Sequence, residues 1–539
     1  MRELKKVFTL VLFLNSILAY SQTTDWVSAA FAFESDTQPE GVAIDNDNNI
    51  ISVGYYRGTL RFQNQSTLLG FGTSGDVVIK KVNDSGELVW AKNYSGAANL
   101  SATTVATGTD NSIYIAGKFN GKTNFDGIEL ISSVSNNNYF VVKMDAEGNT
   151  LWAKTITGIS AEKPMITTDS KNSVYIVGEF SNTKDFFGTE LTRNNGSLYL
   201  VKLDSAGNFL FVKQMGATGS TTRATLVIDK EDNVIITGYS LVNAVFGNDF
   251  YDTGGGFLVK LNVSGDFIWS KQIGGFLPTT IDTDTNNNII LSGSYSGVQE
   301  WDDQTFTSPD FSSIFVAKLS SIGDKIWLKN VPLFEAPFYF RRPVVTLNEN
   351  DQIYFAFTFM GELNYEGSIY NASELNNEPT DIMLSSLDNT NGDLVWNKHL
   401  VKNFYTRDKI IAAKNNSVYI TSKILTSSFD GITLSSFNPP RIIVAKIFDN
   451  TLSTENYFDE NNKSALIYNK LENNYTLQFK TNVDYISLAI FDVKGSLIDR
   501  LSQKGNTNSF AFNINGTPGI YFLKVTSKKG IETFKLLKF

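Results

Sequence analysis

The stretch Asp145-Ala146-Glu147-Gly148-Asn149-Thr150-Leu151-Trp152-Ala153-Lys154 is the clearest copy of a pattern that recurs along the chain. In each copy an aromatic residue follows a Gly by four positions, and a Lys follows the aromatic residue by two. Because side chains alternate along a strand, the aromatic residue and the Lys share one face. The other copies are Gly86/Trp90, Gly207/Phe211, Gly265/Trp269, Gly323/Trp327 and Gly392/Trp396. A period of about 60 residues indicates a repeated supersecondary unit.

The residues around each copy predict four antiparallel strands per unit. An alternating run such as Phe140–Lys143 precedes the Gly, and a short Gly-containing turn joins this run to the aromatic strand, which is typical of a hairpin. After the aromatic strand come a Thr/Val/Ile-rich strand, an Asp/Asn turn and a strand that usually ends in Gly, as from Ile166 to Gly178. The 40 Gly, the many Ser, Thr and Asn residues and the runs of Val, Ile, Phe and Tyr predict an all-β fold of many short strands, and the 42% apolar content is enough to fill sizeable cores.

Aligned in this way, the chain contains seven units. Their second strands are Ile50–Gly54, Ile113–Gly117, Val174–Gly178, Val234–Gly238, Ile289–Gly293, Ile353–Phe357 and Val418–Ser422. The seventh unit ends at Ile442–Lys446 without an aromatic strand, whereas Trp26 stands before the first unit. An N-terminal strand that completes the last sheet closes a ring without an open edge. We therefore predict a seven-bladed β-propeller over residues 22–449; a linear β-solenoid or a row of sandwiches is the alternative.

The units resemble bacterial β-propeller repeats of the form D-x-x-G-N-x-x-W-x-K followed by V-x-x-D-x-x-N-x-Y-x-x-G. They are similar, more distantly, to the tryptophan-bearing repeats of quinoprotein dehydrogenases. That family clasps its cofactor with a vicinal disulfide, and this chain has no Cys. Sialidase Asp-boxes place Gly and Trp three positions apart, whereas the spacing here is four. The resemblance therefore implies the fold and transfers no enzymatic site.

Composition excludes several classes of function. With 46 basic and 55 acidic residues the net charge is −9, which argues against a general nucleic-acid binder and against a polybasic membrane protein. The lack of Cys excludes thiol chemistry, and a single His, His399, argues against a His-based zinc site and a Ser/His/Asp triad. We expect no cofactor, no metal and no catalytic residue.

Residues 1–21 predict a secretory signal peptide. Arg2, Lys5 and Lys6 precede an apolar run from Val7 to Leu18, and small residues stand at the expected cleavage site after Ser21. The alternative, an N-terminal membrane anchor, needs about 20 apolar residues, and this run is shorter. No later segment is long and apolar enough to span a membrane. The chain is expected to be exported.

The end of the chain departs from the repeat. Residues 450–463 are polar, which indicates a linker. Residues 464–539 are expected to form strands without the propeller period, and this pattern predicts a small Ig-like β-sandwich. This segment resembles the type A sorting domain of the type IX secretion system through Asp492–Gly495, Pro518–Val525, Lys535 and Lys538. The resemblance implies the secretion machinery as a partner, passage through the periplasm, and release or attachment at the outer-membrane surface. An accessory binding sandwich is the alternative.

Three sets of residues could have a functional role, but a structural role is the better explanation for each. Asp45–Asn49 and Asp282–Asn286 have the oxygen spacing of calcium loops, but Asp and Asn are ordinary turn formers at this hairpin. Glu300, Asp302 and Asp303 are the best candidates for the carboxylate pair that glycoside hydrolysis requires, but we interpret them as part of a solvated loop. An aromatic column could supply sugar platforms, although one residue per unit favours packing: Phe62, Phe125, Phe186, Phe246, Trp301, Tyr365 and Phe429.

The candidate binding site lies where each aromatic strand leads into the next innermost strand, because these connections surround the channel on one face. The residue fifteen places before each strand end is Pro39, Ala102, Lys163, Arg223, Pro278, Arg342 and Arg407. Arg341 and Tyr339 stand beside this set. Such cations would suit carboxylate or sulfate groups of a glycan or a protein partner. The alternative is that they pair with Glu40, Glu162 or Asp408. We expect a non-catalytic binding protein, with a polysaccharide hydrolase or lyase as the alternative.

Overall fold

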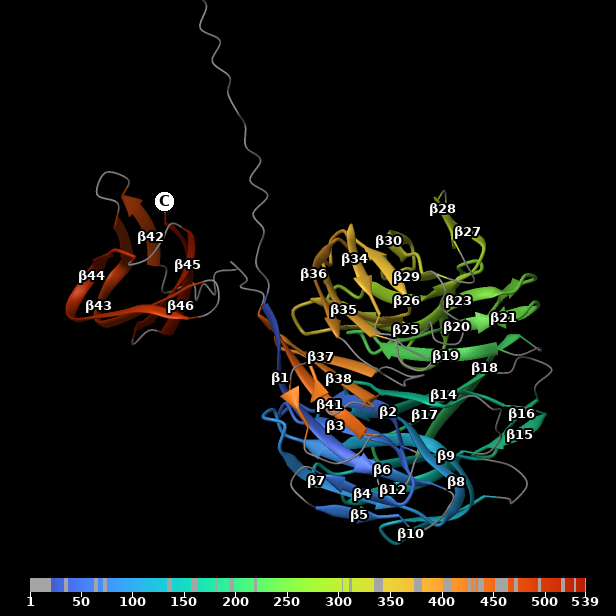
Figure 1. Cartoon of the computed structure of the whole chain (residues 1–539). Coiled ribbons are helices and arrows are strands. Elements are labelled where there is room, and N and C mark those ends of the chain that lie inside the picture. The colour runs from blue at the N-terminus through green and yellow to red at the C-terminus, as the bar shows by residue number, and fades with distance from the viewer. Residues whose placement is uncertain are drawn as a thin grey trace, which may run out of the picture. The chain divides into compact units, whose positions relative to one another are not determined.

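A computed structural model describes most of residues 21–538, and every regular element among the described residues is a β-strand (Figure 1). The residues outside the description are 1–20, 33–36, 63–65, 71–74, 133–137, 157–162, 181, 193–197, 218–220, 303, 310–312, 334–342, 373–380, 401–409, 425–427, 431, 435–440, 451–463, 470–473, 493–495, 515–518, 528–529 and 539. They include the predicted signal peptide and nearly all of the predicted linker. The rest divides into two compact units, Gln22–Asp449 and a C-terminal unit that begins at Asn450.

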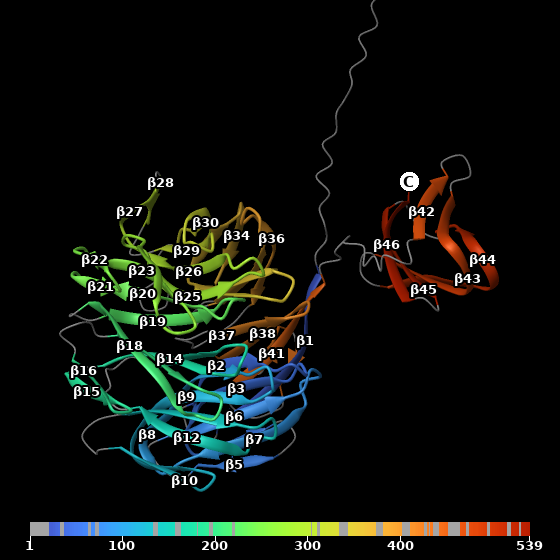
Figure 2. The ribbon, with the colours of Figure 1, turned by 180° about the vertical axis from the view of Figure 1, so that it is seen from behind.

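The first unit repeats one four-stranded antiparallel sheet, as expected from the sequence (Figures 1 and 2). Strands within each sheet follow chain order from the innermost to the outermost. The first three sheets are β2 (Thr37–Ile44), β3 (Ile50–Tyr56), β6 (Asp76–Val82), β7 (Leu88–Tyr94); β8 (Ala97–Thr107), β9 (Ile113–Phe125), β11 (Asn138–Met144), β12 (Thr150–Ile156); and β13 (Met165–Thr168), β14 (Val174–Glu179), β17 (Leu198–Leu203), β18 (Phe209–Ala217). The next three are β19 (Thr221–Ile228), β20 (Val234–Ser240), β23 (Gly255–Leu261), β24 (Phe267–Gln272); β25 (Leu277–Thr283), β26 (Ile289–Tyr295), β29 (Ser313–Leu319), β30 (Lys325–Val331); and β31 (Val344–Leu347), β32 (Ile353–Phe359), β35 (Asp381–Leu387), β36 (Leu394–Leu400).

One further sheet combines strands from both ends of the unit. Its order is β37 (Ile410–Lys414), β38 (Ser417–Ile424), β41 (Arg441–Asn450) and then β1 (Ser21–Ala32), so that the blue first strand lies beside an orange late one (Figure 1). β1 also pairs at its far end with β4 (Thr59–Phe62), with Ala30 opposite Phe62. Strands about 400 residues apart therefore share one sheet.

A short hairpin projects between the second and third strands of each sheet. In the second sheet its two-residue turn has positive φ angles, 51° at Asp126 and 98° at Gly127, as a hairpin turn that matches strand twist requires. The aromatic column begins these turns, and each of its side chains is at most 8% exposed, which confirms the packing interpretation. The hairpin strands not yet named are β5 (Thr67–Leu69), β10 (Ile128–Ile131), β15 (Thr183–Phe186), β16 (Thr189–Thr192), β21 (Ala244–Phe246), β22 (Asp249–Tyr251), β27 (Val298–Trp301), β28 (Gln304–Thr307), β33 (Glu362–Tyr365), β34 (Ser368–Asn371), β39 (Ser428–Phe429) and β40 (Ile432–Thr433).

The Gly–aromatic–Lys repeat forms the contact between neighbouring sheets. Gly148 has φ 83°, and a Cβ there would lie 3.0 Å from the Trp90 ring of the preceding sheet, so that Gly lets the ring pack on the turn. The Trp90 indole donates to the carbonyl of Ala146 at 3.1 Å, and Lys81 Nζ donates to the same oxygen at 3.0 Å. The other glycines packed in this way are Gly207 on Trp152, Gly265 on Phe211, Gly323 on Trp269, Gly392 on Trp327 and Gly86 on Trp26.

Lys81 also forms a buried ion pair within its own sheet, 2.9 Å from Asp45. Burial alone would raise the pKa of Asp45, but hydrogen bonds from Lys81 and Asn49 hold it below the usual value. Equivalent buried pairs join Lys202 to Asp169, Lys260 to Asp229 and Lys318 to Asp284. Lys143 lies 3.7 Å from Asp110, whose side chain is 46% exposed. In five of the described sheets a buried lysine thus ties the inner turn to the following sheet, whereas the sixth sheet has Ser386 at this position.

A second set of contacts joins the turns between the first and second strands. Each of these turns contains an Asn or Asp with φ between 53° and 62°, a conformation these residues tolerate. Its side chain accepts a backbone N–H from the preceding turn, as Asn111 Oδ1 does from Asn46 at 2.8 Å. The other acceptors of this kind are Asn172, Asp232, Asn287 and Asp351. At the last turn Asn415 instead donates backbone N–H to Glu349 at 2.9 Å and side-chain N–H to Asn48 at 3.5 Å.

The C-terminal unit is one five-stranded antiparallel sheet of β42 (Ser464–Asn469), β43 (Asn474–Asp492), β44 (Leu497–Phe512), β45 (Gly519–Ser527) and β46 (Gly530–Lys538). The β43–β44 register breaks between Gln478 and Val483, so that the two halves of these long strands pair differently. Residues from both halves, such as Leu477 and Leu488, share one core with Leu523 of β45. Of the predicted Asp492–Gly495 turn, the structure describes Asp492, which accepts the Ser496 N–H at 2.8 Å.

Candidate functional site

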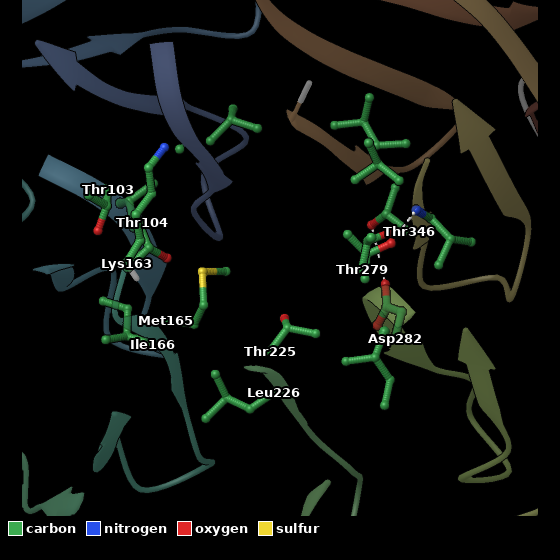
Figure 3. A pocket seen from close by; sticks show the side chains of 18 of the residues that line it. Thr103, Thr104, Lys163, Met165, Ile166, Thr225, Leu226, Thr279, Asp282 and Thr346 are labelled. Carbon is green, nitrogen blue, oxygen red and sulfur yellow. Dashed lines mark hydrogen bonds between the residues drawn. The ribbon is translucent and has the colours of Figure 1, made fainter. Parts of the chain in front are cut away.

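The innermost strands of the first unit surround a cavity of about 370 Å³ (Figure 3). Side chains from β2, β8, β13, β19, β25, β31 and β37 all contribute to its wall. Most lining residues lie within the strands, as Thr103–Val105 do in β8 and Ala224–Leu226 in β19, whereas Lys163 and Pro343 lie just before β13 and β31. The connections in which the sequence predicts a binding site lead into the start of these strands.

β-Bulges turn extra side chains toward the cavity. The registers of β8 and β25 each shift by one residue, between Ala102 and Thr104 and between Pro278 and Thr280. A bulge changes the direction of the side chains that follow it, and as a result both Thr103 and Thr104 line the cavity, as do Thr279 and Thr280. β2 has the same shift between Pro39 and Gly41, with Glu40 as its extra residue.

One wall of the cavity is already hydrogen-bonded from β25 to β31 (Figure 3). The Thr279 hydroxyl donates to the carbonyl of Pro343 at 2.7 Å. Asp282 Oδ2 accepts the Leu347 N–H at 2.8 Å and the Thr346 hydroxyl at 3.2 Å. Burial raises the pKa of Asp282 although these donors oppose the rise. Asp282 therefore holds neighbouring sheets together and has few remaining sites for a ligand.

The opposite wall has a paired cation. Lys163 forms an ion pair with Glu40, whose side chain is only 5% exposed while that of Lys163 is 37% exposed. Thr103 donates to the carbonyls of Ala116 and Pro164 at 3.3 and 3.4 Å. The charges on this wall are balanced within the described structure.

Between these walls lie two hydroxyls without a described partner. Thr104 and Thr225 are 6% and 8% exposed and line the cavity, and no other described residue forms a hydrogen bond with either hydroxyl. Met165, Ile166 and Leu226 supply apolar surface beside them (Figure 3). The sequence alone does not indicate these threonines, because only the bulge in β8 and the packing of the inner strands around the cavity bring them to a common space.

The predicted cationic set is only partly described. Lys163 lies at the cavity and pairs with Glu40, which is the alternative that the sequence left open. Arg223 belongs to β19, but its side chain is outside the description. Tyr339, Arg341, Arg342 and Arg407 also lie outside the described residues.

The seventh unit departs from the spacing used to choose Arg407. Ala413 pairs with Val418, whereas Ile44 pairs with Ile50 in the first unit, so that the turn between β37 and β38 is one residue shorter. A fixed count back from Ser422 therefore reaches one residue too far toward the N-terminus.

The other candidate clusters have structural roles. Asp45 Oδ1 accepts the backbone N–H groups of Asp47 and Asn49 at 3.0 and 2.8 Å, as a turn residue does. Asp302 pairs with Lys325 at 3.2 Å on a projecting hairpin. His399 Nε2 lies 2.8 Å from Asp381 Oδ2.

Comparisons with known proteins concern the fold and the C-terminal segment. A WD repeat-containing protein of Acanthamoeba polyphaga mimivirus is 30% identical over 227 residues, which cover 33% of this chain and 16% of that protein. Regulatory protein FlaEY of Caulobacter vibrioides is 25% identical over 140 residues, covering 24% and 15%. The chain thus spans only a small part of the length of either relative. The solved WD40 repeats of RRP9 align with 8% identity and a TM-score of 0.42, covering 79% of this chain and 100% of that one.

Residues 469–538 match the family described as the secretion system C-terminal sorting domain. Among the described residues there is no helix with the length and hydropathy of a membrane span. The first unit is a β-propeller of repeated sheets, as the sequence predicted. The chain is therefore a β-propeller repeat protein with a type IX sorting domain at its C-terminus, and it is exported to the cell surface or the medium.

Proposed function

We propose that this exported protein is a non-catalytic binding protein whose central cavity, with the loops around its mouth, holds the ligand. The observation that carries the proposal is the cavity of about 370 Å³, to which an inner strand of every repeated sheet contributes. Small-molecule sites have volumes of this order. Two buried hydroxyls, those of Thr104 and Thr225, face this space without a described partner.

The binding face depends on a closed ring, and we propose seven blades with β1 as the outermost strand of the last. Trp26 on β1 supports this arrangement, since its indole donates to the carbonyl of Asp84 at 2.8 Å and its ring packs on Gly86. Thr24 and Lys398 contact Asp430 in the same way that Thr150 and Lys92 contact Asp126. These are the contacts that other neighbouring sheets make.

The remaining organisation follows from the sorting domain. We assign the propeller to residues 22–449, the linker to 450–463 and the sorting domain, as a small Ig-like sandwich, to 464–539. Residues 1–21 act as the signal peptide that delivers the chain to the periplasm, where the type IX machinery takes over.

For the ligand we propose an acidic group, on a glycan or a protein partner, at the mouth of the cavity. Lys163 lines the cavity and its side chain is 37% exposed. Arg223 belongs to the inner strand β19, and the connections that contain Arg341, Arg342, Arg407 and Tyr339 precede the inner strands β31 and β37. Guanidinium groups bind carboxylate and sulfate in two-point geometry, which Lys cannot do.

Incubation of the purified protein with a panel of acidic and neutral polysaccharides and peptides tests the proposal. We expect retention of an acidic ligand without release of a smaller product, and at least tenfold weaker binding after Arg223→Ala combined with Arg342→Ala. Arg500→Ala in the C-terminal unit is the matched control and should leave binding unchanged. Cleavage of a polysaccharide would establish the enzymatic alternative instead, and unaltered binding by the double variant would remove the acidic-group assignment.

A further inference from the structure

We infer that the interior of the cavity, below the mouth, takes the uncharged part of a ligand: an aliphatic group with one or two hydroxyl, amide or carbonyl functions. This inference rests on the proposed binding function of the cavity and assigns the chemistry of its interior, which differs from that of the rim.

The charged side chains in the cavity wall already interact with other described residues. Glu40 is paired with Lys163, and Asp282 accepts three hydrogen bonds, from Leu347, Thr346 and Thr283. No other Asp, Glu, Lys or Arg is among the residues described as lining the cavity. An anionic group that entered would lose its hydration and find no unpaired cation among the described lining residues, and a cationic group would find only Asp282, whose oxygens already accept three hydrogen bonds; entry of either charge is therefore costly.

The groups that remain available to a ligand are two hydroxyls and an aliphatic surface. Thr104 and Thr225 are more than nine-tenths buried, and their hydroxyls can each donate one hydrogen bond and accept others. They lie on β8 and β19, on either side of β13, which supplies Met165 and Ile166. Leu226 extends this apolar surface beside Thr225 (Figure 3). Hydroxyls on either side of an aliphatic wall suit an amphiphilic, uncharged group.

The types of side chain in the lining also indicate which class of ligand fits. No Phe, Tyr or Trp is among the described lining residues, although the chain has 40 Phe and 22 Tyr. Sugar rings and aromatic ligands commonly stack on such side chains. The described lining therefore favours an aliphatic group over a sugar ring or an aromatic one.

Three probes of equal chain length that differ in charge test the inference: octanamide, octanoate and octylamine, each titrated by calorimetry into the full-length protein. We expect octanamide to bind at least tenfold more tightly than either charged probe. Thr225→Val keeps the shape of the side chain and removes its hydroxyl, so that octanamide should bind several-fold more weakly. Thr225→Phe fills the cavity and should abolish binding. Thr189→Val, on an exposed hairpin strand, is the matched control and should bind like the unmodified protein.

The outcomes separate this inference from the proposed function. Octanoate or octylamine binding as tightly as octanamide would overturn the inference, as would octanamide binding that survives Thr225→Phe in a folded variant. Retention of an acidic polymer without binding of octanamide would leave the proposed function standing and reject the uncharged interior. Failure of every probe and every polymer would reject both.

Discussion

Lys80 and Lys81 are consecutive buried lysines on β6 whose ammonium groups have opposite surroundings. Lys81 pairs with Asp45 at 2.9 Å. Lys80 is 3% exposed, its described hydrogen bond goes to the carbonyl of Ser28 on β1 at 3.1 Å, and burial lowers its pKa to about 7. The residues at its position in the other sheets are uncharged: Val142, Val201, Val259, Ala317, Ser385 and Ala445.

The lowered pKa of Lys80 predicts a pH dependence of stability with a defined sign. The folded state disfavours the charged form, so that above the unfolded pKa of 10.5 this lysine has no ionisation penalty. As the pH falls from 10.5 to about 7, the unfolded chain binds a proton at Lys80 that the folded chain does not bind, so the free energy of unfolding decreases. Below about pH 7 both states are protonated at Lys80, and the loss of stability stays constant. Lys80→Met should therefore stabilise the propeller at pH 7 by roughly 2–4 kcal/mol.

Denaturant unfolding of the unmodified protein and of Lys80→Met between pH 6 and 10 measures this effect, because the protonation of Lys80 in the folded and unfolded states changes over roughly this range. The advantage of Lys80→Met should shrink steadily as the pH rises. An advantage that does not change with pH would mean that the Lys80 ammonium is paired or hydrated.

At the scale of elements, β1 is expected to stabilise the propeller as the outermost strand of another sheet does. Trp26→Ala removes the indole bond to Asp84 and the packing on Gly86, and Trp152→Ala removes the same contacts with Ser205 and Gly207. Both variants should lose roughly 2–3 kcal/mol, since each ring is partly buried. Thermal unfolding of the two variants checks this. If Trp26→Ala left the unfolding temperature unchanged while Trp152→Ala lowered it, β1 would not be the strand that closes the ring.

The sequence predicted the strands well because their order is periodic. The position of Gly148 relative to Trp152 and Lys154 repeats, and the packing of Trp90 on Gly148 explains why it must. The residues that line the cavity were harder to predict from the sequence. A bulge such as that at Thr103 leaves no mark in the alternation of side chains, and the short turn before Val418 shifts the count to the strand end by one residue. Pairing of Lys163 with Glu40 depends on residues 123 positions apart.

At the scale of the whole molecule, two units have separate cores. The C-terminal unit has its own apolar cluster, which includes Leu477, Ile486 and Leu523. The propeller core consists of clusters between neighbouring sheets, as where Ile79 of β6 packs with Phe140 of β11. Because none of the apolar clusters among the described residues combines side chains of both units, each unit is expected to fold when the other is removed.

Removal of residues 464–539 therefore separates folding from export. The truncated propeller should keep the thermal unfolding temperature of its transition in the full-length protein, because the sheets, the Gly–Trp contacts and the buried Lys–Asp pairs all lie within Gln22–Asp449. It should nevertheless accumulate in the periplasm, since the segment that matches the sorting domain is gone. Fractionation of cells that express the full-length and truncated chains, with protease accessibility of intact cells as the measure of surface exposure, tests both statements. Surface exposure of the truncated chain would mean that residues 464–539 are dispensable for sorting, whereas a truncated chain that no longer unfolds cooperatively would mean that the two units do not fold independently.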